Sequence, residues 1–192
     1  MISDTKVVAI GGGTGLSTML KGLKLHTHNI TAVVTVADDG GSSGILRSDL
    51  GMLAPGDVRN CVSALAEVDP VMGELLNFRF KDGSLKGHSL GNLFLAALNE
   101  TSSSFDEAVK KFSHLAGVVG TVYPVTNESV TLSALLEDGR LIEGESHIGV
   151  HHDGPKNGIV KLMVNPEKPK AVDGVIKALE KADIIVLGPG GL

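Results

Sequence analysis

The order of apolar and polar residues predicts a strand, a turn and a helix at the start of the chain. Residues 7–10 (VVAI) form an apolar run that is too short for an amphipathic helix and is typical of a strand buried on both faces. Residues 11–15 (GGGTG) would then turn the chain, and apolar residues at helical spacing follow them. A second β-branched run at 30–37 (ITAVVTVA) completes a βαβ unit, so the two strands should be parallel.

Similar patterns assign most of the remaining chain. The expected helices are 58–65 with Asp57 as its N-cap, 70–80, 93–98, 104–115 with a capping box, and 171–181. Strand-like segments between 120 and 164, with a hairpin turn at Asp138-Gly139, predict a β-rich insertion of about 118–166 in which no ligand chemistry is evident. Residues 183–187 (DIIVL) should return to the parallel sheet.

These elements predict an α/β fold: one Rossmann-like nucleotide-binding domain over 1–192, with helices on both faces of a mostly parallel sheet and the β-rich insertion beside it. The last predicted strand runs into Gly188-Pro189-Gly190, and no helix follows to cover its apolar side. The chain therefore looks C-terminally incomplete, and we expect it to be the N-terminal portion of a longer protein.

Composition narrows the function mainly by exclusion. The net charge is −5 and aromatic residues make up 3% of the chain, so neither a basic surface nor stacking platforms for nucleic acid are expected. Cys61 is the single cysteine, which excludes an intrachain disulfide and a Cys-based metal site. No apolar run is long enough to span a membrane and no secretory signal is evident, so the expected location is the cytoplasm.

The glycine turn after the first strand is a candidate phosphate site. Gly12, Gly13 and Thr14 lie where a strand ends and a helix begins, which places backbone N–H groups and the positive end of a helix dipole around one point. The sequence is neither a Walker A loop nor G-x-G-x-x-G, because Leu16 stands where the third glycine would be. A tight turn that needs glycine for its own geometry is the alternative.

Two adjacent carboxylates, Asp38 and Asp39, end the second predicted strand, at the same edge of the sheet as the glycine turn. They could hold a divalent cation such as Mg²⁺, or they could accept hydrogen bonds from sugar hydroxyls. They could also do no more than cap turns. The following GGSSG matches the nucleophile elbow of hydrolases, but such a match is common in a segment so rich in Gly and Ser.

Two further polar clusters precede predicted helices. Arg59 and Asn60 fall in the first turn of the helix after Asp57, where Arg59 could bind an anion or pair with a nearby aspartate. In the second cluster, His88, Ser89 and Asn92 could hydrogen-bond a ligand, with His88 as the candidate acid or base. The alternative is that Ser89 caps the helix and the histidine lies on the surface.

Four segments in order resemble one known family: AIGGGTGLSTMLKGLK, TVADDGGSSGILRSDLGMLAPGDVRNC, KGHSLGNLFLAAL and ADIIVLGPGG. Together they are similar to the YvcK proteins, or gluconeogenesis factors, a branch of the superfamily named for CofD, the 2-phospho-L-lactate transferase. The likeness extends over nearly the whole chain. It implies a modified Rossmann-like sheet and a nucleoside-diphosphate ligand.

The two branches imply different ligands. In the transferase branch the resemblance implies a guanosine diphospholactate and a divalent metal. In the YvcK branch it implies a UDP-sugar such as UDP-N-acetylglucosamine and a regulatory role in cell shape and growth on gluconeogenic carbon. The residues that the resemblance assigns to the ligand are Gly12, Gly13, Thr14, Asp38, Asp39, His88, Ser89, Asn92 and the turn Gly188-Pro189-Gly190. Gly191 departs from the family, which usually has Ser there.

Two hypotheses follow. The first is a regulatory protein that binds a UDP-sugar or another nucleoside diphosphate, without nucleic acid or a membrane span as partners and with a homodimer left open. The second is a metal-assisted transferase in which Asp38 and Asp39 hold Mg²⁺. The motifs match the YvcK branch, and the shortage of aromatic residues leaves little to stack a deazaflavin acceptor against, so we favour the first hypothesis.

Overall fold

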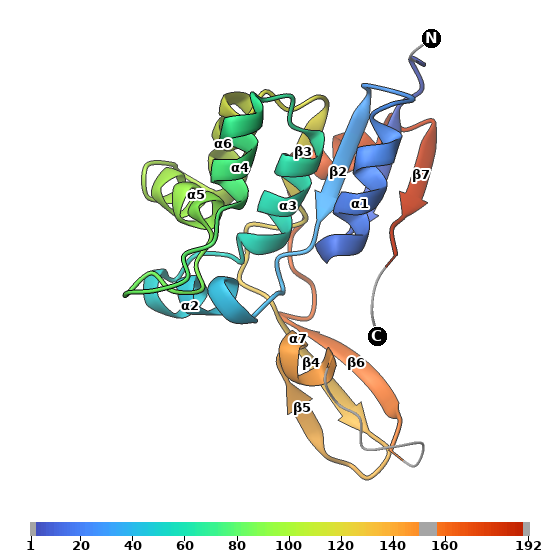
Figure 1. The fold of residues 1–192 in the computed structure, drawn as a ribbon. Helices are drawn as coiled ribbons and strands as arrows, with labels where there is room; N and C mark the ends of the chain where they lie inside the picture. The colour runs from blue at the N-terminus through green and yellow to red at the C-terminus, as the bar shows by residue number, and fades with distance from the viewer. Residues whose placement is uncertain (1–2, 150–156, 190–192) are drawn as a thin grey trace.

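The computed structural model describes residues 3–149 and 157–189, and it consists of a helix-covered parallel sheet and a smaller antiparallel sheet that projects from one end (Figure 1). The strands are β1 (Val7–Gly11), β2 (Ile30–Val34), β3 (Thr121–Pro124), β4 (Thr131–Leu136), β5 (Leu141–Glu143), β6 (Ile159–Asn165) and β7 (Ile184–Leu187). The helices are α1 (Gly13–Leu23), α2 (Gly41–Leu50), α3 (Gly56–Leu65), α4 (Pro70–Asn77), α5 (Leu90–Glu100), α6 (Phe105–Leu115), α7 (Glu145–Gly149) and α8 (Asp173–Glu180).

The larger sheet has the strand order β3-β2-β1-β7, and all of its neighbours are parallel. Val7 of β1 pairs with Ile30 on one side and with Ile184 on the other. The predicted βαβ unit and the return of the last strand to this sheet are therefore confirmed. Strand β2 ends at Val34 and not at the predicted residue 37, because the chain leaves the sheet there to form the loop before α2.

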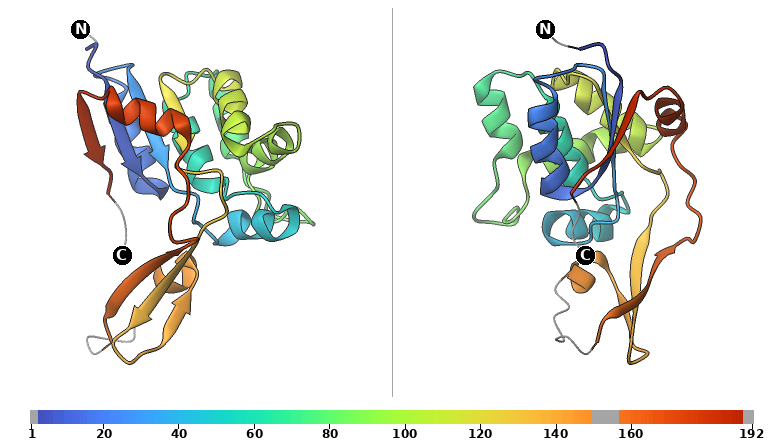
Figure 2. Two further views of the ribbon diagram at one scale, coloured as in Figure 1. Left: turned by 180° about the vertical axis from the view of Figure 1, so that it is seen from behind. Right: turned by 90° about the vertical axis from the view of Figure 1, so that its right-hand side faces the viewer.

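Helices cover both faces of the parallel sheet, as predicted, because its apolar residues alternate between the faces. Ala9 and Ala32 pack toward the side that carries α1, α3, α5 and α6, while Val8 and Val33 pack toward Val175 of α8. Figure 2 shows α8 on the side of the sheet opposite α1. At the edge of the sheet, the β7 residues Ile184 and Ile185 remain about half exposed.

Three expectations about local structure are wrong. No helix was expected over the segment GGSSG, but α2 begins at Gly41, and its residues Ser42, Ser43 and Leu46 are buried. Asp57 was expected to be the N-cap of α3, but the N-cap is Pro55, and the Asp57 carboxylate accepts a hydrogen bond from the Gly13 N–H instead. Thr121–Pro124 were expected to belong to the β-rich insertion of about 118–166, but they form β3 of the parallel sheet.

The smaller sheet has the order β5-β4-β6 and is antiparallel. Its hairpin turns at Asp138-Gly139 as predicted, with Gly139 at φ +85°, where glycine is the favoured residue. The short helix α7 packs on β4 and helps to bury Ala134 and Leu136. Figure 1 shows α7 at the end of this sheet nearest the parallel sheet, so the insertion reaches the edge where the glycine turn lies. No helix within the described residues is long and apolar enough to cross a membrane.

Candidate functional site: two joined cavities at the end of the parallel sheet

A cavity of about 540 Å³ lies at the carboxyl ends of β1 and β2, where open α/β sheets bind ligands. The structure thus brings together the two loops that the sequence singled out. Leu132 and Glu145 of the insertion form another part of the wall. Nothing in the sequence indicated a polar group from the insertion at this cavity. The described lining residues are Gly12, Gly13, Thr14, Gly15, Thr35, Ala37, Asp38, Asp57, Leu132, Glu145 and Pro189.

The glycine turn is fixed by two different requirements. Gly12 is the extended N-cap of α1, and a Cβ there would lie 2.3 Å from Thr35 Cγ2, so packing excludes a side chain. Gly13 has φ +63°, a conformation that L-residues adopt at a cost, but a Cβ there would meet only Asp57 Oδ1 at 3.7 Å. Packing against Thr35 therefore requires glycine at position 12, whereas the tight-turn explanation accounts for Gly13, which also has open space in front of it.

Three helices, α1, α2 and α3, begin at this site without a side-chain cap on their N-cap residue. Two of their N–H groups nevertheless have side-chain partners, because the Gly13 N–H of α1 donates to Asp57 and the Gly56 N–H of α3 donates to Ser43 Oγ at 3.2 Å. Uncapped helix starts leave backbone N–H donors for another partner. Three of them around one space are the geometry that an anionic ligand needs.

Three carboxylates face the larger cavity, which makes its wall acidic. Burial raises the pKa of Asp57 to about 6, and the neighbouring charges of Asp38 and Glu145 add to the rise. Burial also raises the pKa of Glu145, with contributions from Asp38 and Asp39. Asp38 itself accepts a hydrogen bond from the Gly40 N–H at 2.9 Å through Oδ1. None of the described residues that line this cavity is basic.

Asp39 serves a different purpose from Asp38. Its Oδ1 accepts a hydrogen bond from the Ser146 N–H at 2.8 Å, at the start of α7 in the insertion. Burial acts to raise the pKa of Asp39, but hydrogen bonds from Ser146 and from the Glu145 N–H, together with the charge of Arg47, hold it below its usual value. The second carboxylate of the pair thus fastens the insertion to the loop after β2.

This difference bears on the cation that the family resemblance implies. A Mg²⁺ ion held by both aspartates would need their oxygens to converge, whereas Asp39 turns to α7 and Asp38 to Gly40. Within 3–149 and 157–189, no group of three or more His, Cys, Asp or Glu side chains is arranged to hold a metal ion. The pair Asp38 and Asp39 does not fit a metal site in this structure.

A second cavity of about 180 Å³ adjoins the first and shares Asp38 and Asp57 with it. Its other described lining residues are Gly40, Gly41, Ser42, Ser43, Gly56, Arg59, Asn60, Arg79 and Asn92. Three residues expected at the site from the sequence, Arg59, Asn60 and Asn92, therefore lie here and not in the larger cavity.

Polar side chains in the wall of the second cavity and behind it form a hydrogen-bonded network whose members are buried, apart from the exposed Asn77. Asn92 Nδ2 donates to Ser42 Oγ at 3.1 Å, and the same hydroxyl lies 3.0 Å from His88 Nδ1. Arg59 Nε donates to Asn92 Oδ1 at 3.3 Å, and Arg59 Nη1 donates to Asn77 Oδ1 at 2.7 Å. The network joins α2, α3, α4 and α5, so these four helices hold the cavity in shape.

Several predicted residues lie behind the cavity walls. His88 is buried, not on the surface, and it contacts Ser42, while Ser89 caps α5 by accepting from the Asn92 N–H at 3.2 Å. The Gly188 N–H donates to the Ile10 carbonyl at 2.7 Å and continues the β7 pairing, whereas Pro189 lines the larger cavity. Gly190 and Gly191 lie outside the described residues.

Sequence reasoning missed several lining residues. Ser42, Ser43 and Asp57 belong to the motifs that were singled out. Their position next to the ends of predicted strands and helices could have identified them as lining residues. Glu145 and Leu132 had no such signal, because their position depends on how the insertion lies against the parallel sheet.

The model of one protein family, described as 2-phospho-L-lactate transferase CofD, matches residues 7–192. The chain belongs to the CofD family. A relative from Thermoanaerobacterium thermosulfurigenes is 56% identical over 191 residues, which are 100% of this chain and 59% of that protein. A Bacillus subtilis relative named gluconeogenesis factor is 46% identical over 190 residues, covering 97% of this chain and 58% of that protein.

A crystal structure of a Bacillus halodurans protein has the same CofD-family fold. It is 44% identical to this chain with a TM-score of 0.92, over 98% of this chain and 60% of that one. The chain thus spans less than two thirds of the length of these relatives. Together, the names of the relatives and the family model confirm the resemblance to the gluconeogenesis factors within the CofD family.

Proposed function

We propose that the protein binds a nucleoside-diphosphate sugar of the UDP-N-acetylglucosamine class and acts as a regulator of cell shape and growth on gluconeogenic carbon. The observation that carries the proposal is the larger cavity, whose wall combines the glycine-rich start of α1 with the carboxylates of Asp38, Asp57 and Glu145. Its volume of about 540 Å³ lies in the range of ordinary ligand sites, about 300–1,000 Å³. Carboxylates accept hydrogen bonds from ribose and sugar hydroxyls, and each such charge-assisted bond contributes about 1.5–3 kcal/mol.

The name of the Bacillus subtilis relative supports the physiological half of this proposal. The second candidate is a metal-assisted transferase acting on a nucleoside-diphosphate-linked substrate, which the description of the family model favours. The different directions of Asp38 and Asp39 are unfavourable for it. We therefore place the regulator first.

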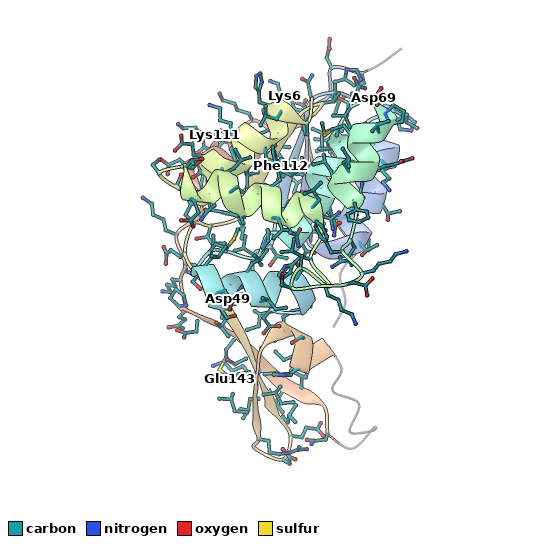
Figure 3. All side chains as sticks on the ribbon, turned by 60° about the vertical axis from the view of Figure 1, so that its left-hand side comes forward. Lys6, Asp49, Asp69, Lys111, Phe112 and Glu143 are labelled. Atoms are coloured by element: carbon teal, nitrogen blue, oxygen red, sulfur yellow. The ribbon has the colours of Figure 1, made fainter. Side chains whose placement is uncertain are left out.

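Calorimetric titration of the full-length protein with UDP-N-acetylglucosamine, with Mg²⁺ and with EDTA, separates the two candidates. The regulator should bind with little loss in EDTA, and Asp38→Asn should weaken binding by about tenfold, or about 1.4 kcal/mol. The matched control is Asp49→Asn, since Asp49 carries the same charge on the exposed side of α2 (Figure 3). Binding that vanishes on chelation would favour the transferase.

A substitution at Gly13 tests the role of the glycine turn. Because a Cβ at Gly13 has room but a positive φ, Gly13→Val should leave a folded protein and abolish nucleotide binding. Circular dichroism and the same titration measure both effects. If Gly13→Val binds as the wild type does, the glycines serve only the turn.

A further inference from the structure

The smaller cavity contains a buried positive charge that no carboxylate contacts. Arg59 is 7% exposed, and its Nε and Nη1 atoms donate to the neutral amide oxygens of Asn92 and Asn77. Between described residues, the side-chain ion pairs within 4.0 Å are Lys111–Glu107 and Arg140–Asp138. A buried charge without a carboxylate in direct contact is unfavourable, and burial accordingly lowers the pKa of Arg59, although the nearby charge of Asp57 acts in the opposite direction. An anion that entered the cavity would give the guanidinium a direct partner of opposite charge.

The other walls of the smaller cavity favour the same kind of guest. Arg79 lines it as well, and its charge lies close enough to add to the lowering of the Arg59 pKa, so two positive charges face one small space. The first turns of α2 and α3 line it at Gly41 and Gly56, and in α3 the Gly56 N–H already donates to Ser43 Oγ at 3.2 Å. Backbone N–H groups at helix starts and guanidinium groups both bind phosphate oxygens.

The two cavities differ in charge although they share a boundary. Asp38 and Asp57 lie on that boundary and line both of them. Among the other described lining residues, the larger cavity has one further charged residue, Glu145, and no basic one. The smaller cavity has Arg59 and Arg79. A diphosphate is repelled by carboxylates, while hydroxyl groups donate hydrogen bonds to them. The charge difference therefore fixes which end of a ligand enters which cavity.

We infer that the smaller cavity is the anion subsite, which holds the diphosphate of the ligand against Arg59 and Arg79 while the hydroxyl-bearing nucleoside or sugar occupies the larger, acidic cavity. This inference rests on the proposed function, because it orients the ligand proposed there. It places the diphosphate nearer the starts of α2 and α3 than the glycine turn that the sequence suggested. In this arrangement the two arginine side chains neutralise the charge of the diphosphate, and no cation is required.

The test uses inorganic pyrophosphate, titrated calorimetrically into the full-length protein in EDTA at low salt. Arg59→Gln should weaken pyrophosphate binding by about tenfold or more, and Arg59→Lys should restore part of it, because a charge returns without the planar fork. Arg79→Gln changes an exposed residue and should weaken binding by about threefold to tenfold without affecting the fold. Lys177→Gln is the matched control, because it removes an exposed positive charge on α8, which lines neither cavity, and it should leave pyrophosphate binding unchanged.

Thermal unfolding of Arg59→Gln is measured in parallel, and Arg79→Gln carries the test if that variant does not fold. Pyrophosphate binding that is undetectable at millimolar concentration, or that is unchanged in Arg79→Gln and in a folded Arg59 variant, overturns the inference. If UDP-N-acetylglucosamine binds and ignores both arginines, the inference fails while the proposed function stands. If pyrophosphate binds through the arginines and UDP-N-acetylglucosamine does not bind, the subsite stands and the proposed function fails.

Discussion

The two sheets of the molecule share one cavity but are stabilised very differently. Strands β1 and β2 are buried between helices on both faces, with Ala9 and Ala32 fully inaccessible. Strand β6 of the antiparallel sheet leaves most of its residues exposed, among them Val160 at 62%. Because buried apolar area provides most of the stability of a fold, the insertion should be the part that opens first.

The insertion is held by a small set of polar contacts at its base, together with the packing of Val130 and Leu132 against the main core. Arg47 of α2 donates to the Asp38 carbonyl at 3.2 Å and to the Val130 carbonyl at 2.9 Å, which links the loop after β2 to the approach to β4. Thr126 Oγ1 donates to the Lys170 carbonyl at 2.6 Å and joins the two ends of the insertion. Thus the rigid sheet provides the glycine turn, and a lightly held element provides Glu145.

The largest effect that separates the two regions should come from removing one leucine side chain from each. Leu20 of α1 is fully buried, so Leu20→Ala should lower the free energy of unfolding by about 2–5 kcal/mol. Leu162 of β6 is 43% exposed, so Leu162→Ala should cost less than about 1 kcal/mol. Urea unfolding measures both. If the two variants lose the same free energy of unfolding, β6 is packed more tightly in solution than the exposure of its side chains indicates.

The next effect depends on pH and is centred on Asp57 in the helix-covered body. Its pKa rises to about 6 in the folded protein from an ordinary value of 3.8, so the folded state holds this proton more tightly than the unfolded chain does. The stability should therefore fall as the pH rises from about 4 to about 6, and it should stay lower above that range.

The variant Asp57→Asn removes the charge and retains an oxygen that can accept from the Gly13 N–H. We expect it to raise the free energy of unfolding by about 1–2 kcal/mol at pH 7 and to change it little at pH 4. Urea unfolding from pH 4 to pH 8 tests this expectation. A gain that is the same at both ends of the range would show that the charge of Asp57 is not its cause.

The body of the fold could be predicted from sequence because its signals are local. The apolar run before Gly11 and the β-branched run from Ile30 identify buried strands by themselves. For α6, Ser104 was recognised as the cap, and its hydroxyl accepts from the Glu107 N–H at 3.4 Å. Helix α2 was missed because Gly and Ser favour turns, and its first turn is instead fixed by distant partners such as Asn92 and Gly56.

The candidate site could be predicted only in part, because adjacent residues can face different partners. Asp38 and Asp39 are neighbours in the sequence, yet Asp39 contacts Ser146, which lies 107 positions away. Glu145 reaches the larger cavity through the same contact between distant segments. Whether the predicted residues bind a nucleotide stays a prediction.

The smallest effect should come from the contact that fastens the insertion. Asp39→Ala removes the acceptor for the Ser146 N–H at the start of α7, and the loss of a helix cap costs about 0.5–2 kcal/mol. The cost should be local: hydrogen exchange should quicken in β4, β5 and α7 and remain unchanged in β1 and β2. Because Glu145 then loses its fixed position, nucleotide binding should weaken by a few-fold.

Asp69→Ala is the matched control, because Asp69 caps α4 by accepting from the Val71 N–H at 2.9 Å. Figure 3 shows Asp69 at the opposite end of the molecule from Glu143 of the insertion. Its removal should cost about the same free energy, quicken exchange in α4, and leave nucleotide binding unchanged. If Asp39→Ala instead quickens exchange throughout the parallel sheet, the insertion does not open as a separate unit, and the contrast between the two sheets does not extend to their dynamics.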